Sequence, residues 1–270
     1  MKIEHRPPAP EGNRALVLTF DNLGEASELE RGTWPQSEPL GRHPSVRLAL
    51  PRLLQALDAF GLSATFFVEA INCELYPEAL REIVARGHEL GMHGWRHEAW
   101  RQLAAADERR LLARGARAFA ALGLEVRAFR PPGGALTERT PQLLREFGYR
   151  WCSAAGGEPA VGQGLASVPF EWELVDAYYL MERFAGLRGR SAPFSAASVT
   201  ERFTAALVAG RDTVQTLVLH PFLMLDGAWW RGVQEVLACI AALSRDGRLV
   251  AMPGGRYVER MTAAVTVHGG

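Results

Sequence analysis

Short apolar runs alternate with segments of helical periodicity along most of this 270-residue chain, and this alternation limits its possible folds more than any other feature. Residues 15–20 have the continuous apolar character of a buried strand, and residues 45–60 carry apolar side chains at helical spacing before Gly61. Further strands are expected at residues 64–68, 89–93, 126–130, 149–153, 166–169, 216–220 and 249–252, and further helices at residues 77–86, 106–122 and 141–147. This repetition predicts an α/β fold with a mostly parallel sheet covered by helices.

The number of strand–helix units predicts the shape of the sheet. Seven or eight units favour closure into a single distorted (β/α) barrel over an open sheet. The length and a hydrophobic content of 48% allow one large core, so residues 1–270 are expected to form a single domain. Three irregular stretches rich in glycine, at residues 24–44, 156–164 and 186–195, are expected to be lids or rims of a site.

Charge and cysteine content argue against several classes of protein. Thirty basic residues balance thirty acidic ones, so no strong field would attract a nucleic acid or an anionic membrane. The N-terminus lacks the apolar core of a signal peptide, and no run approaches the ~20 apolar residues of a membrane span. Cys73, Cys152 and Cys239 are odd in number and far apart, which fits a reducing compartment. We therefore expect a cytoplasmic protein, and homo-oligomerisation stays open.

Ionisable side chains gather where the expected strands end. The four residues at or just beyond the carboxyl ends of different strands are Asp21, His93, Arg130 and His220. A (β/α) barrel collects its reactive groups at that end, so these residues are expected around one cavity. His93 and His97 have a spacing that places both imidazoles on one face of a helical turn, where they could reach one divalent ion. A hydrogen-bonded structural role is the alternative for this pair.

Four motifs at these strand ends resemble those of the polysaccharide deacetylase family, also called the NodB-homology family. Residues 19–22 (Thr-Phe-Asp-Asn) are similar to its Thr-Phe-Asp-Asp, and residues 93–97 (His-Gly-Trp-Arg-His) to its His-(Ser/Thr/Gly)-x-x-His. Residues 130–134 (Arg-Pro-Pro-Gly-Gly) are similar to Arg-x-Pro-x-Gly, and residues 217–220 (Leu-Val-Leu-His) to Leu-x-x-His. The resemblance implies a catalytic domain with the distorted barrel of this family and a carbohydrate or small-molecule substrate.

Within the family, the chain looks most like the branch with allantoinase-like amidohydrolases and intracellular peptidoglycan deacetylases. That branch carries a Trp-x-Leu-Asp-Asp-like segment after a short strand. Residues 168–176 resemble it more loosely, with Asp176 at the second acidic position and Val175 at the first.

The resemblance implies how the first two motifs would act in amide hydrolysis. Asp21 would be the general base that takes a proton from water, and His93 and His97 would be ligands of a divalent metal, zinc or a similar ion. The usual third ligand of the family is the second Asp of the first motif, where this chain has Asn22. An amide oxygen brings no negative charge, so zinc affinity should fall. Three outcomes are open: a weakened site that includes Asn22, recruitment of another carboxylate such as Asp21 or Glu25, or no metal.

The last motifs would supply an acid and two groups that tune the site. His220 would be the general acid, and Asp176 would orient its imidazole. Arg130 would pair with Asp21 and favour its charged form. A buried ion pair that organises loops is an equal alternative for Arg130, and both roles can hold together.

Three functions are compatible with these motifs. The first is hydrolysis of a non-peptide C–N bond, as metal-assisted deacetylation of an N-acetylated sugar or related amide. The second, implied by the allantoinase-like branch, is metal-independent hydrolysis of a small ureide or cyclic imide. The third is a degenerate member that binds carbohydrate without catalysis. Asp21, Arg130 and His220 argue against the third, because a binding module needs no acid, base and tuning cation together.

Overall fold

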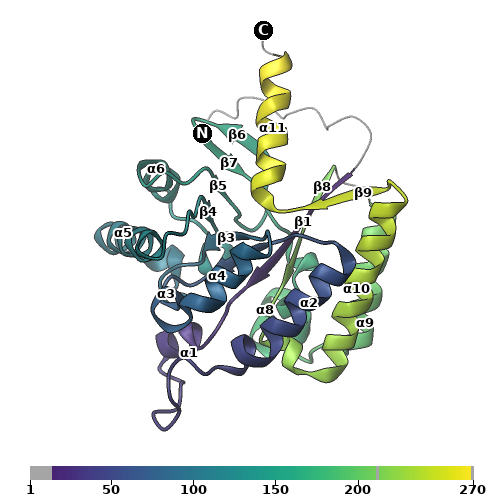
Figure 1. Ribbon diagram of the computed structural model, residues 1–270, viewed down its shortest axis with the longest axis horizontal. Helices are drawn as coiled ribbons and strands as arrows, with labels where there is room; N and C mark the ends of the chain where they lie inside the picture. Colours follow the sequence, from purple (N-terminus) through teal and green to yellow (C-terminus); the bar gives the residue numbers. More distant parts are fainter. Residues whose placement is uncertain (1–13, 211–212, 269–270) are drawn as a thin grey trace.

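A curled β-sheet lies at the centre of the computed structural model, which describes residues 14–210 and 213–268 (Figure 1). Its strands are β1 (Arg14–Asp21), β2 (Thr65–Val68), β3 (Glu89–Met92), β4 (Ala128–Phe129), β5 (Trp151–Cys152), β6 (Ala160–Gly162), β7 (Leu165–Ser167), β8 (Val214–Leu219) and β9 (Leu249–Met252). They follow the order β6-β7-β5-β4-β3-β2-β1-β8, and β9 pairs with β1 beside this path. Every neighbouring pair is parallel except β6 and β7.

Helices cover the outside of the sheet, as expected for strands that are joined by helical crossovers (Figure 1). They are α1 (Ala26–Arg31), α2 (Leu50–Phe60), α3 (Asn72–Leu75), α4 (Pro77–Ala85), α5 (Ala105–Ala121), α6 (Thr140–Glu146), α7 (Asp176–Leu180), α8 (Ala185–Arg188), α9 (Ala196–Ala209), α10 (Gly227–Arg245) and α11 (Gly254–His268). The long helix α10 packs against α9, α2 and β9. No helix among the described residues is both long and apolar enough to cross a lipid bilayer.

Strand β1 is the central strand that sets the position of the polar residues. All its residues after Arg14 are buried, and it pairs with β8 along residues 15–20 and with β2 along residues 19–21. Because these strands and β3 are parallel, their carboxyl ends meet at one edge of the sheet. The polar residues at that edge are Asp21, Glu69, His93 and His220.

The barrel closes through short contacts rather than through a long ladder. Isolated parallel bridges join Ala155 to Phe170 and Val175 to Val218. The segment between Phe170 and Val175 therefore connects the β5 side of the sheet to β8 near their carboxyl ends. This geometry confirms the expected distorted (β/α) barrel, with closure concentrated beside the polar residues.

The expected irregular stretches contain some regular structure. Residues 24–44 include α1, residues 156–164 include β6, and residues 186–195 begin inside α8. The helix expected at residues 45–60 starts with a π-helical segment, η1 (Ser45–Ala49), before α2. The short elements α1, β6 and α8 complete too few turns or alternations to produce a recognisable period, so the pattern did not predict them.

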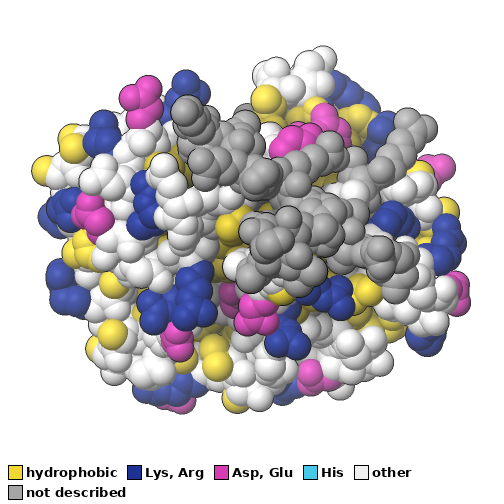
Figure 2. Space-filling model, turned by 90° about the horizontal axis from the view of Figure 1, so that it is seen from above, with side chains coloured by type: hydrophobic (Ala, Val, Ile, Leu, Met, Phe, Trp, Pro, Cys, Tyr) yellow, Lys and Arg dark blue, Asp and Glu magenta, His cyan; other side chains and the backbone are white. Residues whose placement is uncertain are grey.

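The face that bears α11 carries charges of both signs. Where Figure 2 shows described residues on this face, basic and acidic side chains are interspersed. This mixture agrees with the equal numbers of basic and acidic residues in the sequence.

Candidate active site

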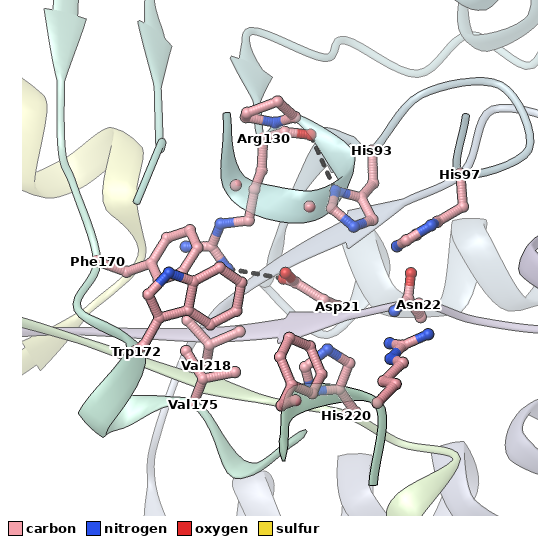
Figure 3. A pocket seen from close by; sticks show the side chains of 15 residues that line it. Asp21, Asn22, His93, His97, Arg130, Phe170, Trp172, Val175, Val218 and His220 are labelled. Carbon is pink, nitrogen blue, oxygen red and sulfur yellow. Dashed lines mark hydrogen bonds and ion pairs between the residues drawn. The ribbon is translucent and has the colours of Figure 1, made fainter. Parts of the chain in front are cut away.

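A buried ion pair joins Asp21, the last residue of β1, to Arg130, which follows β4 (Figure 3). Arg130 Nη1 donates to Asp21 Oδ1 at 2.7 Å and to Thr19 Oγ1 at 2.8 Å. Its Nη2 donates to Ser153 Oγ at 2.8 Å. These bonds fix Asp21 by its Oδ1 atom. No hydrogen bond from the described residues engages Oδ2, so this oxygen is available to a molecule in the pocket.

Arg130 is enclosed by aromatic rings as well as by its polar partners. Its guanidinium carbon lies 4.2 Å from the ring centroid of Phe67 and 5.0 Å from that of Phe170. Burial lowers the pKa of Arg130, while the charge of Asp21 and their hydrogen bond oppose that shift. A charge this buried requires a counterion. Arg130 is therefore a buried ion-pair partner, as the structural alternative predicts, and also part of the pocket wall.

His220 is held by Asp176 on the opposite side of the pocket. The carboxylate of Asp176 accepts from His220 Nδ1 at 2.5 Å and from the His220 backbone N–H at 2.9 Å. It also accepts from the Ala177 N–H at 2.7 Å and from Trp229 Nε1 at 3.2 Å. Because a carboxylate accepts at Nδ1, the other imidazole nitrogen, Nε2, is left for the pocket. The looser sequence match at residues 168–176 thus located a residue that contacts His220 directly.

His93 and His97 lie in a loop after β3, so the expectation of a helical turn was wrong. The chain reverses because Gly94 and His97 both have positive φ angles, of 75° and 74°. A Cβ atom on Gly94 would also lie 2.7 Å from Glu98 Oε2, so glycine is required there on two grounds. The imidazoles still converge, with ring centroids 4.9 Å apart. Convergence therefore comes from a tight loop rather than from helical periodicity.

Both imidazoles are in the neutral form that binds metals. His93 Nδ1 donates to the backbone carbonyl of Arg130 at 2.9 Å, which leaves the lone pair on Nε2. Burial lowers the pKa of His93 to about 3 against the opposing effect of this hydrogen bond. Burial and the neighbouring His93 lower the pKa of His97 well below its usual value. Near neutral pH, each ring therefore offers a lone pair.

Glu69 completes a cluster that the sequence analysis missed. It directly follows β2, is fully buried, and offers an oxygen that lies with His93 and His97 ligand atoms within 4.8 Å of one another. Its Oε2 accepts from the Leu23 N–H at 3.3 Å and from Asn72 Nδ2 at 3.4 Å, while Oε1 has no partner. Burial raises the pKa of Glu69 to about 8. The available signal was its position, since an acidic residue followed a strongly apolar strand whose end meets that of β1.

Asn22 and Glu25 have different places in this arrangement. Asn22 turns its amide oxygen toward His97, and this buried oxygen has no hydrogen-bond partner among the described residues (Figure 3). Glu25 is turned away from the cluster, because its carboxylate accepts from the Tyr76 hydroxyl and, at 2.7 Å, from the Gly41 N–H. Glu69 and Asn22, each with an unpartnered buried oxygen, thus lie beside the two imidazoles. This donor set fits a divalent ion, with Glu69 as the available carboxylate.

One pocket of about 280 Å³ is lined by the Asp21–Arg130 pair, Asn22 and the three histidines, whereas Glu69 is not among its lining residues (Figure 3). One wall is polar and includes Asp21, Asn22, the two clustered imidazoles and His220. The facing wall is apolar, and in it Trp172 packs against Phe170 and Phe184 with ring centroids 5.3 Å apart in each case. Except for Asp176, which lies behind His220, and Glu25, which is turned away, all the site residues expected from the sequence line this pocket. The predicted convergence of these side chains is therefore present.

Comparisons with known proteins agree with this arrangement. A sequence profile described as polysaccharide deacetylase matches residues 9–152. Chitin deacetylase 1 of Saccharomyces cerevisiae is 32% identical over 109 residues, which are 40% of this chain and 34% of that protein. The chain thus aligns with only about a third of the length of this relative.

Solved structures extend the likeness to the whole fold. A Mycobacterium smegmatis protein assigned to the polysaccharide deacetylases superposes with a TM-score of 0.81 at 28% identity, covering 97% of this chain and 96% of that one. Puue allantoinase superposes with a TM-score of 0.75 at 18% identity, covering 96% and 94%, which shows a shared fold. Because the family profile matches more than half of its length, the chain belongs to the polysaccharide deacetylase family.

Proposed function

We propose that the protein hydrolyses the C–N bond of an N-acetylated sugar or a related amide with the help of a divalent ion such as zinc. The observation that carries this proposal is the convergence, around one pocket, of the Asp21–Arg130 pair, the Asp176–His220 pair and the imidazoles of His93 and His97. Amide hydrolysis needs a base for water, an acid for the departing nitrogen and stabilisation of the oxyanion. Asp21 would be the base and His220 the acid. His93 and His97 would hold the ion that stabilises the oxyanion.

Asp21 and His220 divide the proton transfers. Asp21 Oδ2 takes a proton from water as the water oxygen bonds to the amide carbon. The Arg130 guanidinium pairs with Asp21 and holds its carboxylate in a fixed orientation. When the C–N bond breaks, His220 Nε2 gives a proton to the departing nitrogen. Until that transfer, Asp176 stabilises the protonated imidazole through its hydrogen bond to Nδ1.

His93, His97 and Glu69 would hold the ion, with the Asn22 oxygen beside them. A bound ion would polarise the amide carbonyl and acidify water. The Arg130 carbonyl keeps His93 in the tautomer that presents Nε2 to this position. Glu69 provides the negative charge that Asn22 lacks, so the recruited carboxylate is one that the sequence analysis did not consider.

Acetate release is the direct test. Purified protein would be supplied with N-acetylglucosamine and its oligomers after chelation and after addition of zinc, cobalt or manganese. Asp21→Asn should lower the rate on the order of 10³-fold, as expected for removal of a general base. Asp107→Asn, which changes a surface pair with Arg110, is the matched control and should keep full activity. No acetate with any of these metals would refute the deacetylase proposal, and ligand binding without turnover would favour a binding protein.

A metal-independent ureide or cyclic imide hydrolase is the second candidate. Two observations favour it: Asn22 replaces the usual acidic ligand, and a pKa of about 8 keeps Glu69 largely uncharged near pH 7 in the absence of an ion. A pocket of about 280 Å³ also suits a compact substrate. Hydrolysis of allantoin by protein treated with a chelator, with no increase in rate when zinc is added, would favour this candidate over the first.

A further inference from the structure

Arg183 is a cation in the pocket that the proposed hydrolysis leaves without a role. It belongs to the short 3₁₀ segment η5 (Glu182–Phe184) and lines the same pocket as Asp21 and His97. Within residues 14–210 and 213–268, no ion pair or hydrogen bond engages its guanidinium, in contrast to the buried Arg130.

Aromatic packing fixes the segment that carries Arg183. The neighbouring Phe184 packs on Trp172, and the guanidinium carbon of Arg183 lies 5.1 Å from the Phe184 ring centroid. Trp172 in turn packs on Phe170, which lies against the Arg130 guanidinium. Arg183 is thus presented at the end of an apolar wall that begins beside the ion pair of the site.

The charges around the pocket favour an anionic ligand at Arg183. Among the pocket-lining residues Asp21 is the one carboxylate, and it is already paired with Arg130. Partial loss of solvation and the charge of Arg31 lower the pKa of Arg183, yet an arginine remains protonated near neutral pH. Arg183 and Arg31 also contribute to the lowered pKa of His97, after burial and His93. Two arginines and one carboxylate therefore line the pocket, and none of the lining carboxylates pairs with Arg183.

We propose that Arg183 binds a carboxylate of the substrate, so that the pocket selects an N-acetylated sugar or amide that carries an acid group. This inference rests on the proposed hydrolytic function. A guanidinium presents paired N–H donors whose spacing matches the two oxygens of a carboxylate. The apolar wall formed by Phe170, Trp172 and Phe184 would face the ring of the same substrate, while its acetamide reaches Asp21 and His220.

Calorimetry with two ligands of nearly equal size tests this inference. N-acetylmuramic acid and its methyl ester differ mainly in the carboxylate charge, and a His220→Gln background prevents turnover while it leaves Asp21 and Arg130 paired. The acid should bind about tenfold more tightly than the ester. Arg183→Gln should remove this difference. Arg190→Gln is the matched control, because it removes a charge from the same part of the chain, where Arg190 lies over the Phe194 ring 4.2 Å away.

Three results would overturn the carboxylate site. Acid and ester could bind equally, or a preference for the acid could persist in Arg183→Gln. The third is Arg183-dependent binding of N-acetylglucosamine 6-phosphate that is tighter than that of the acid, which would favour a phosphate ligand. The proposed function is tested separately by acetate release from the ester with the unmodified protein. Arg183-dependent binding of the acid without acetate from either compound would refute hydrolysis and leave the anion site supported.

Discussion

Two histidines on opposite sides of the pocket, His93 and His220, are oriented by different partners. A backbone carbonyl accepts from His93 Nδ1, whereas the Asp176 carboxylate accepts from His220 Nδ1. A carbonyl fixes a tautomer but cannot balance a positive charge in a buried site, and a carboxylate can do both. His93 is therefore suited to remain neutral and offer a lone pair. His220 is suited to carry a proton and release it.

Removal of the Asp176 charge should cause the largest loss of activity among the changes that test this difference between the two histidines. In Asp176→Asn the side chain keeps its shape, but it no longer stabilises a protonated His220, so kcat should fall on the order of 10³-fold with little change in KM. Initial rates over a range of pH measure this. Asp226→Asn is the matched control, because Asp226 caps α10 at the surface and asparagine caps helices equally well. A kcat near that of the unmodified protein would show that the carboxylate is not needed and that both histidines can work from neutral partners.

Zinc affinity should depend strongly on His93 and little on His220. His93→Gln removes a ligand and should weaken zinc binding by about 100-fold or more, whereas His220→Gln should change it less than about threefold. Titration with a competing chromophoric chelator measures both dissociation constants. Equal losses of zinc affinity in the two variants would mean that His220 also binds the ion. The two histidines would then not have different roles.

The strand-end residues could be predicted because they occur in short motifs at the ends of clear strands. The four residues Asp21, His93, Arg130 and His220 lie at or just beyond the ends of four such strands, and parallel pairing brings these ends together. The geometry of the His93–His97 loop could not be predicted, since a spacing of four residues also fits a helical turn. Only the positive φ angles of the loop distinguish these cases.

Residues without a motif were harder to find. Glu69 occurs as a single acidic residue after β2, and Arg183 lies in a segment with no readable period. Trp229 is buried on α10 and carries no motif, yet its indole donates to Asp176. Tertiary contacts of this kind depend on the relative position of distant elements, which local sequence patterns do not contain.

Glu69 should make the stability of the metal-free protein depend on pH. Its folded-state pKa of about 8 lies above the ordinary pKa of 4.5 for an unburied Glu. Folding therefore retains a proton that the unfolded chain releases, and this stabilisation is complete below pH 4.5 and is lost as the pH rises towards 8. In the presence of a chelator, the unfolding midpoint of the unmodified protein should fall, relative to that of Glu69→Gln, between these values.

Thermal scans of three proteins would measure this difference. Glu235→Gln, a substitution on the exposed surface of α10, controls for the loss of a carboxylate and should follow the unmodified protein. Added zinc should reduce the loss at pH 8, because a bound ion favours the charged carboxylate. Parallel midpoint curves for Glu69→Gln and the unmodified protein would contradict a protonated Glu69 and would favour a charged, preformed ligand beside His93.

The smallest loss of activity is expected when the hydrogen bond from Trp229 to Asp176 is removed. The carboxylate accepts four hydrogen bonds, of which the one from Trp229 Nε1, at 3.2 Å, is the longest. Trp229→Phe removes this donor and keeps a ring on α10, so the free energy of unfolding should fall by about 1 kcal/mol and kcat by only a few-fold. Denaturant titration and initial rates measure the two quantities. A loss of activity as large as that in Asp176→Asn would mean that the indole, rather than the carboxylate charge, keeps His220 in its working orientation. The contrast with His93 would then be one of geometry and not of charge.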